Sequence, residues 1–245
     1  MEKLRFLTYE EIQNKCERLS DVYEIDEEKF YGVVEKWANE ETAIESKLLA
    51  SFEELLQVVS NEITSMEAAL EMKPTCRMGC AFCCYFPIIV NEMEAKLMKK
   101  AIGHFPEERR GKIQSHLLTY YQKYGEQLDR LTALDFETEN NFKRTYIDRQ
   151  IPCPMLNPET NQCMAYEIRP LPCRTYMNYT DPKVCFENVM PKETVSFEFL
   201  YEQYMGALNE FMQFLSEEGD TGFVDYPNDI YATDYLVNWL RPSQR

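Results

Sequence analysis

Apolar residues recur three and four positions apart through long stretches of the chain, the spacing that places them on one face of an α-helix. Between Asp26 and Met72 the pattern is compatible with one long helix, or with two helices separated by the polar stretch 39–42. Pro74 disfavours a helical conformation at the residue before it, so the run is expected to stop there. The apolar positions of this run include Phe30, Val33, Val34, Trp37, Ile44, Leu48, Leu49, Phe52, Leu55, Leu56 and Val59.

Helical spacing returns after the first group of cysteines. Asn91 is a suitable N-cap for a helix that carries Met93, Leu97, Met98 and Ile102. Residues 103–106 form a predicted turn, and the further helices are expected at 107–134, 193–218 and 230–240. The chain is therefore predicted to be mainly α.

Two segments lack the helical period, namely 76–90 and the proline-rich 151–191. Both carry cysteines, so the helices are expected to form a scaffold and these loops to converge on a metal site. The predicted organisation is an N-terminal helical segment (1–72), a metal-binding core (73–190) with a helical insert (91–150), and a C-terminal helical segment (191–245). All three are expected to pack as one compact unit.

Charge narrows the range of partners. The 26 lysines and arginines stand against 42 aspartates and glutamates, a formal net charge of −16. Such a chain repels nucleic acid phosphates and anionic lipid surfaces, so neither nucleic acid nor a membrane is an expected partner. The first residues lack the apolar stretch of a secretory signal, and the expected location is the cytoplasm.

Nine cysteines in a reducing compartment favour metal or redox chemistry over a disulfide framework. Disulfide frameworks are typical of short secreted chains, and an odd number of cysteines does not support that alternative. Cys16 lies apart on a predicted N-terminal helix and is interpreted as a small, half-buried apolar residue.

The other eight cysteines form two groups. The first has the pattern C-x3-C-x2-C-C, and the members of the second are separated by nine, nine and eleven residues. Thiolates are soft ligands that suit zinc, copper(I) or an iron–sulfur cluster, whereas calcium and magnesium prefer oxygen. The predicted metal ligands are Cys76, Cys80, Cys83 and Cys84 in the first group, and Cys153, Cys163, Cys173 and Cys185 in the second.

Several features bear on how these thiolates bind. Adjacent Cys83 and Cys84 do not easily point the same way, so they serve different metals or one of them is spare. Arg169 and Arg174 bracket Cys173, and their guanidinium groups are expected to offset thiolate charge from outside the ligand shell.

The metal itself is left open between an iron–sulfur cluster and zinc. Structural zinc sites usually present two C-x2-C pairs, and here only Cys80 and Cys83 have that spacing. Three closely spaced cysteines with a remote fourth favour a [4Fe–4S] cluster slightly. His104 and His116 lie in the helical insert, so an all-thiolate site is expected. Eight ligands also allow two four-thiolate centres.

The two groups together resemble the CxxCxxCC family of zinc- or iron-chelating proteins, the YkgJ-type cysteine-cluster proteins. Beyond the first four cysteines, the resemblance rests on 88–90, the helix containing Glu92 and Glu94, and three later motifs: Cys-Pro-Met-Leu at 153–156, Cys-Met-Ala-Tyr-Glu-Ile-Arg-Pro at 163–170, and Cys-Arg at 173–174. Asp181 to Cys185 is similar to the family's closing cysteine motif. The resemblance implies metal binding without a defined reaction.

Two function classes therefore remain. The first is a metal-stabilised binding or structural module, which would bind a protein partner. The second is an iron–sulfur-dependent redox or transferase enzyme. The distantly similar flagellin lysine methylases make lysine methyl transfer to a protein one example of the second class. This chain has Tyr85-Phe86-Pro87 where those proteins typically carry Gly-Trp. Residues 76–83 also match the radical-SAM spacing, but the alternating strands and helices of those enzymes do not follow.

Overall fold

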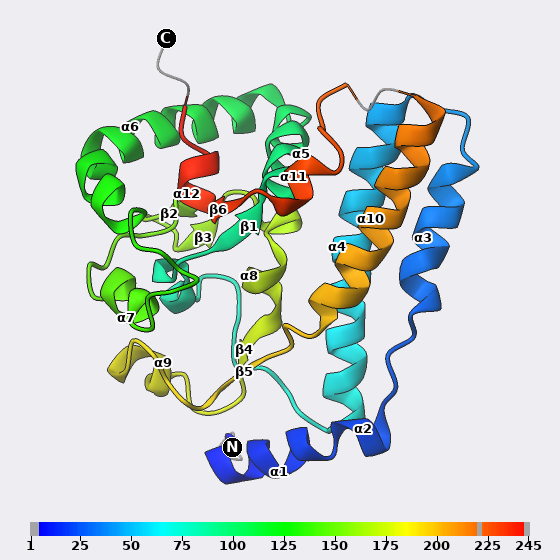
Figure 1. Ribbon diagram of the computed structural model, residues 1–245. Coiled ribbons are helices and arrows are strands. Elements are labelled where there is room, and N and C mark those ends of the chain that lie inside the picture. The colour runs from blue at the N-terminus through cyan, green and yellow to red at the C-terminus, as the bar shows by residue number, and fades with distance from the viewer. Residues whose placement is uncertain (1–4, 220–221, 243–245) are drawn as a thin grey trace.

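Helices dominate the computed structural model, which describes residues 5–219 and 222–242. The predicted mainly α class is confirmed (Figure 1). The longer helices are α1 (Tyr9–Glu17), α3 (Glu28–Ala38), α4 (Ile44–Ala69), α5 (Glu92–Gly103), α6 (Glu107–Leu131) and α10 (Leu200–Glu218). The shorter ones are α2 (Leu19–Val22), α7 (Phe142–Ile147), α8 (Leu171–Thr175), α9 (Lys183–Glu187), α11 (Asn228–Tyr231), α12 (Leu236–Trp239) and the 3-10 helices η1 (Phe82–Tyr85) and η2 (Tyr166–Ile168).

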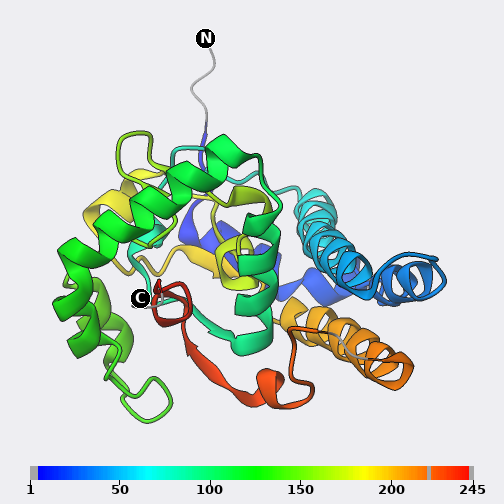
Figure 2. The ribbon, with the colours of Figure 1, turned by 90° about the horizontal axis from the view of Figure 1, so that it is seen from above.

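Helices α3, α4 and α10 form a bundle on one side of the molecule, and their ends lie together in the view from above (Figures 1 and 2). Of the two alternatives for 26–72, the structure has two helices, because the polar stretch 39–42 falls between α3 and α4. The apolar stripes of the three helices face one another, and Leu55, Leu208 and Phe211 are completely buried. Burial of such side chains contributes roughly 1.5–3 kcal/mol each.

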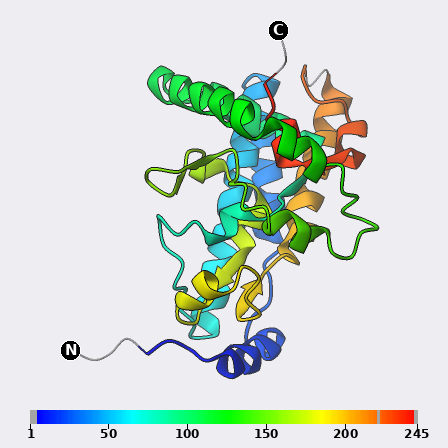
Figure 3. The ribbon, with the colours of Figure 1, turned by 90° about the vertical axis from the view of Figure 1, so that its left-hand side faces the viewer.

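The helical insert follows its predicted start. The Asn91 side chain caps α5 by accepting the backbone N–H of Glu94 at 2.7 Å. Helix α6 begins at Glu107 as expected and ends at Leu131. It lies across the side of the molecule opposite the bundle (Figure 3).

The two C-terminal helix predictions were partly wrong. The predicted helix 193–218 begins only at Leu200, after strand β5 (Thr194–Ser196). The predicted helix 230–240 is divided into α11, strand β6 (Thr233–Tyr235) and α12. In both places backbone pairing with an earlier strand, β4 for β5 and β1 for β6, overrides the local apolar spacing.

The described residues form three antiparallel strand pairs, of which β1–β6 joins distant parts of the chain. Strand β1 (Ile89–Asn91) pairs with β6 in the register Ile89↔Tyr235, and β4 (Tyr176–Asn178) pairs with β5 in the register Tyr176↔Ser196. The short pair β2 (Leu156–Asn157) and β3 (Gln162–Cys163) closes the loop before Cys163. These pairs fix the ends of the segments that carry the cysteines.

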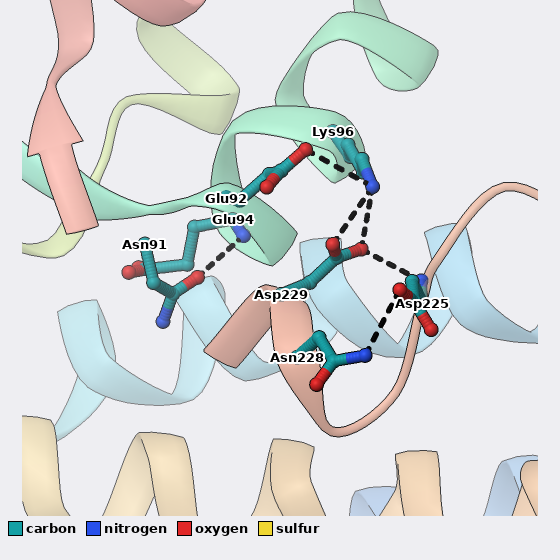
Figure 4. Close-up of polar contacts among 7 residues, drawn as sticks. All are labelled: Asn91, Glu92, Glu94, Lys96, Asp225, Asn228 and Asp229. Atoms are coloured by element: carbon teal, nitrogen blue, oxygen red, sulfur yellow. Dashed lines mark hydrogen bonds and ion pairs between the residues drawn. The ribbon is translucent and has the colours of Figure 1, made fainter. Parts of the chain in front are cut away.

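A buried ion pair joins the C-terminal segment to α5 (Figure 4). Lys96 Nζ lies 2.8 and 2.7 Å from the carboxylate oxygens of Asp229, and 3.2 Å from Glu92. Asp229 is only 3% exposed and also accepts the backbone N–H of Asp225 at 2.7 Å. The carboxylate is thus compensated on both sides, which a buried charge requires.

The expected three-part organisation stays a prediction, although α10 from the last part packs on α3 and α4 from the first. Within the described ranges, no helix has both the length and the apolar character needed to cross a bilayer.

Candidate metal centre

The two cysteine segments are in direct contact through their backbones. The N–H of Cys153 donates to the carbonyl of Cys84 at 2.6 Å. The N–H of Asn178 donates to Cys76 Sγ at 3.3 Å, and the N–H of Thr75 donates to the Asn178 carbonyl at 2.8 Å. All nine cysteines lie within the described residues and carry free thiols. The fold therefore brings together two cysteine segments that are about seventy residues apart in sequence.

Four of the cysteines line one small cavity and are called here the outer thiol group: Cys76, Cys80, Cys83 and Cys185. The cavity has a volume of about 30 Å³, and a cavity needs roughly 10–15 Å³ to hold one water molecule. A single metal ion fits such a space, whereas a cubane cluster requires the surrounding loops to move apart. Aromatic side chains complete the wall, with Phe82, Phe86 and Tyr176 among them.

The other four are called the inner thiol group: Cys84, Cys153, Cys163 and Cys173. Each of the pairs Cys84–Cys153, Cys153–Cys163 and Cys153–Cys173 is close enough for one thiolate to raise the pKa of the other. Cys83 influences members of both groups, so it stands at the boundary between them.

The outer thiols share protons in pairs. A hydrogen bond from Cys76 stabilises the Cys80 thiolate and lowers the pKa of Cys80 to about 6. The same bond, together with burial, raises the pKa of Cys76. A second pair links the two groups, because hydrogen bonding between the adjacent thiols lowers the pKa of Cys83 and raises that of Cys84. Cys80 and Cys83 are therefore the thiols most readily available as thiolates.

The inner thiols are kept protonated by their surroundings. Burial raises the pKa of Cys153 to about 12 and raises that of Cys173 well above its usual range. Burial likewise raises the pKa of Cys185 in the outer group to about 11. Thiolate is the ligating form, so a metal bound here must displace protons, and its affinity must rise with pH.

The thiols of each group lie near one another but do not point at a shared position where a metal ion could bind. Within residues 5–219 and 222–242, no three or more His, Cys, Asp or Glu side chains are positioned to hold a single ion. Ligation by either group therefore requires rotation of cysteine side chains. The histidines have other neighbours: His104 faces Glu45 at 3.6 Å, and the His116 ring lies beside Tyr120.

Both bracketing arginines interact electrostatically with cysteines, Arg169 with Cys163 and Cys173, and Arg174 with Cys173. Burial raises the pKa of Cys163, and the Arg169 charge opposes that shift. The guanidinium lies over the Tyr166 ring at 4.2 Å, and its buried Nε has no hydrogen-bond partner among the described residues. An unpaired buried donor beside several cysteines fits an anionic metal–thiolate group, which would accept this hydrogen bond.

Arg174 acts on the backbone of the cysteine loop. Its guanidinium donates to the Glu167 carbonyl, to the Arg169 carbonyl at 2.9 Å and to the Ser60 hydroxyl on α4 at 2.8 Å. It is 7% exposed. This residue thus fixes the loop between Cys163 and Cys173 against the helical bundle.

Two further residues that position the loops were missed by the sequence analysis. Arg109 on α6 donates to the Met164 carbonyl at 2.7 and 3.2 Å and pairs with Glu167 at 2.7 Å. The Asn178 side chain donates to the Thr75 hydroxyl at 3.0 Å, next to Cys76. Neither has a sequence signature, because an arginine on a charged helix and an asparagine in a proline-rich segment are usually surface residues, whereas Asn178 ends strand β4 and is buried.

The comparison with protein families agrees with this arrangement. Residues 75–194 match the model of the CxxCxxCC family, described as a "putative zinc- or iron-chelating domain". The matched range contains both thiol groups and excludes Cys16. No curated protein and no solved structure matches the chain. The resemblance expected from the cysteine motifs is confirmed, because residues 75–194 of this chain match the model of the CxxCxxCC family.

Proposed function

We propose that the chain is a metal-binding protein whose eight clustered cysteines hold zinc or iron. The observation that supports this most directly is the common cavity of Cys76, Cys80, Cys83 and Cys185, which draws ligands from both cysteine segments. The buried Nε of Arg169 has no hydrogen-bond partner among the described residues, so it is a free donor suited to an anionic metal centre. Nine free thiols suit a reducing compartment, and we place the protein in the cytoplasm.

The eight ligands are assigned to two centres. Tetrahedral coordination by four thiolates is the usual form of a structural zinc site and also serves a cubane cluster. The outer group supplies one set of four and the inner group the other, with the adjacent Cys83 and Cys84 assigned to different centres. Two kinds of centre are compatible with these ligands. The spacing of Cys76, Cys80 and Cys83 favours [4Fe–4S] clusters, whereas the small outer cavity favours zinc.

Metal analysis of protein purified without oxygen tests this proposal. Iron with inorganic sulfide and broad visible absorption identifies clusters, and zinc in a colourless protein identifies zinc sites. Cys80→Ser and Cys163→Ser should each remove the metal of one centre only. Metal-free protein that remains fully folded with eight titratable thiols would contradict the proposal as a whole. Loss of all metal in both variants would contradict only the division into two centres.

An iron–sulfur-dependent redox or transferase enzyme is the second candidate function. Its support is the wall of the outer cavity, where Phe82 is 41% exposed and lies edge-to-face with the exposed Phe186. A centre behind such a wall is accessible to a small molecule. Reversible reduction by dithionite, followed as bleaching of the visible absorption, is expected for the enzyme and not for a zinc-stabilised module.

A further inference from the structure

A wide cleft lies away from the predicted metal ligands, between helices α1 and α2, which Figure 1 shows at the lower end of the bundle, and the start of α10. Its volume is about 950 Å³, at the upper end of the range typical of ligand sites. It is bounded by α1 and α2, by the connection from α2 to α3, and by the start of α10. Three separate parts of the chain therefore build it.

The cleft has an apolar floor. Met66 on α4 lies at its base and is completely buried. Leu19 and Ile25 are partly exposed, and Phe199 at the start of α10 is 42% exposed. An exposed aromatic ring beside two aliphatic side chains offers apolar surface that water solvates poorly.

One rim of the cleft is strongly acidic. Glu24, Asp26, Glu27 and Glu28 all line it, and all four are exposed. Asp26 lies 3.7 Å from Lys29. Among the ion pairs of residues 5–219 and 222–242, the three glutamates have no cationic partner. Lys29 is shared with the buried Glu62, which it binds more closely at 2.7 Å, so it offsets only part of the Asp26 charge.

An acceptor on the wall also lacks a donor. Gln203 lines the cleft, and its Oε1 has no hydrogen-bond partner within the described residues. The apolar floor and the acidic rim, in which three glutamates have no cationic partner among the described residues, match one kind of occupant. They suit a segment with lysine or arginine side chains for the rim and aliphatic side chains for the floor.

We infer that this cleft docks a cationic, amphipathic segment of a partner protein. The inference does not depend on the metal-binding proposal, because none of the eight predicted ligands lines the cleft. The chain as a whole carries a net charge of −16, so a weak attraction for any cation is expected everywhere. Specific docking differs from this general attraction in two ways: the segment binds at the cleft, and its binding requires the apolar floor.

The test uses the full-length protein with its metal content intact and a short amphipathic peptide of lysine and leucine as the probe. Binding is measured by calorimetry and located by chemical-shift changes in the NMR spectrum. The charge variant combines Glu24→Gln, Asp26→Asn, Glu27→Gln and Glu28→Gln. The matched control removes four exposed carboxylates elsewhere, at Glu40, Glu41, Glu107 and Glu126.

The expected result is binding that shifts the resonances of the cleft and weakens about tenfold or more in the charge variant. The control variant should bind within about twofold of the wild type, since it loses the same net charge outside the cleft. Phe199→Ser removes apolar surface and leaves the charge of the rim unchanged, and it should also weaken binding of the peptide. This variant serves as the test if the charge variant does not fold. Equal weakening in the charge and control variants, or equally tight binding of the peptide with glutamine for lysine, would overturn the inference.

Discussion

The helical bundle and the cysteine region are held together in different ways. In the bundle, α3, α4 and α10 bury apolar side chains such as Leu48, Leu55 and Phe211 completely. In the cysteine region, η1, η2, α8 and α9 have five residues or fewer, and single polar side chains such as Arg174 hold the connecting loops. Helices this short have little stability of their own. From this comparison we expect the bundle to be stable on its own and the cysteine region to depend on the metal proposed to bind its thiols.

The largest effect is therefore expected from removing metal. Cys173→Ser replaces a soft thiolate by a poor ligand, and structural zinc sites in small peptides contribute about 10 kcal/mol or more. We expect backbone amides in 76–90 and 151–191 to lose much of their protection against hydrogen exchange, while amides of α4 and α10 keep theirs. Hydrogen-exchange mass spectrometry on wild type and variant measures this difference. A uniform loss of protection in both regions would mean that the bundle also depends on the metal.

The reverse experiment weakens the bundle and spares the thiols. Phe211 on α10 is completely buried, and truncation of such a side chain to alanine costs about 3–5 kcal/mol. Phe211→Ala should lower the free energy of unfolding, measured in urea, by that amount and leave the metal stoichiometry of the folded protein unchanged. Phe211→Leu is the matched control with a smaller loss. A folded variant that no longer holds metal would show that the two regions are coupled more closely than the comparison implies.

The same contrast explains what the sequence could predict. The bundle helices and α5 follow from local apolar spacing, and Asn91 as the cap of α5 follows from its side chain. Strands β4, β5 and β6 have three residues each, and the partner of β6 lies more than a hundred residues away. The local spacing of apolar residues therefore could not predict these strands. At the candidate site, cysteine chemistry identified the family and the candidate ligands. The positioning roles of Arg109 and Asn178 depend on tertiary contacts and were not predictable.

A buried carboxyl where the insert meets the bundle gives a pH-dependent prediction. Glu94 is 4% exposed, has no cationic ion-pair partner among the described residues, and lies 3.4 Å from the Tyr201 hydroxyl (Figure 4 shows Glu94 on α5). Burial raises the pKa of Glu94 to about 7. The folded state thus binds this proton more tightly than the unfolded state. Its contribution to stability is complete below about pH 4.5 and is lost as the pH rises through about 7.

Glu94→Gln removes this titration while keeping the shape of the side chain. At pH 8 the variant should be more stable than the wild type by about 1–3 kcal/mol, and at pH 5 the two should be nearly equal. Urea unfolding at the two pH values measures both differences. Asp229→Asn is the contrasting control, because that carboxylate has a lysine partner and its loss should destabilise the protein at pH 8. A difference between Glu94→Gln and wild type that does not change with pH would contradict the assignment.

The smallest effect is expected at the one cysteine outside both thiol groups. Cys16 lies half-buried on α1, packed against the core, and burial alone raises its pKa. This matches the small apolar role predicted for it, and the family match begins far beyond it. Cys16→Ser should cost about 1 kcal/mol or less, because it exchanges one small side chain for another at a site that is not fully enclosed. Its metal content should equal that of the wild type, in contrast to Cys80→Ser and Cys173→Ser. Metal stoichiometry and a thermal melt on the three variants decide the matter: if Cys16→Ser loses metal while Cys173→Ser retains it, the ligands have been assigned to the wrong cysteines.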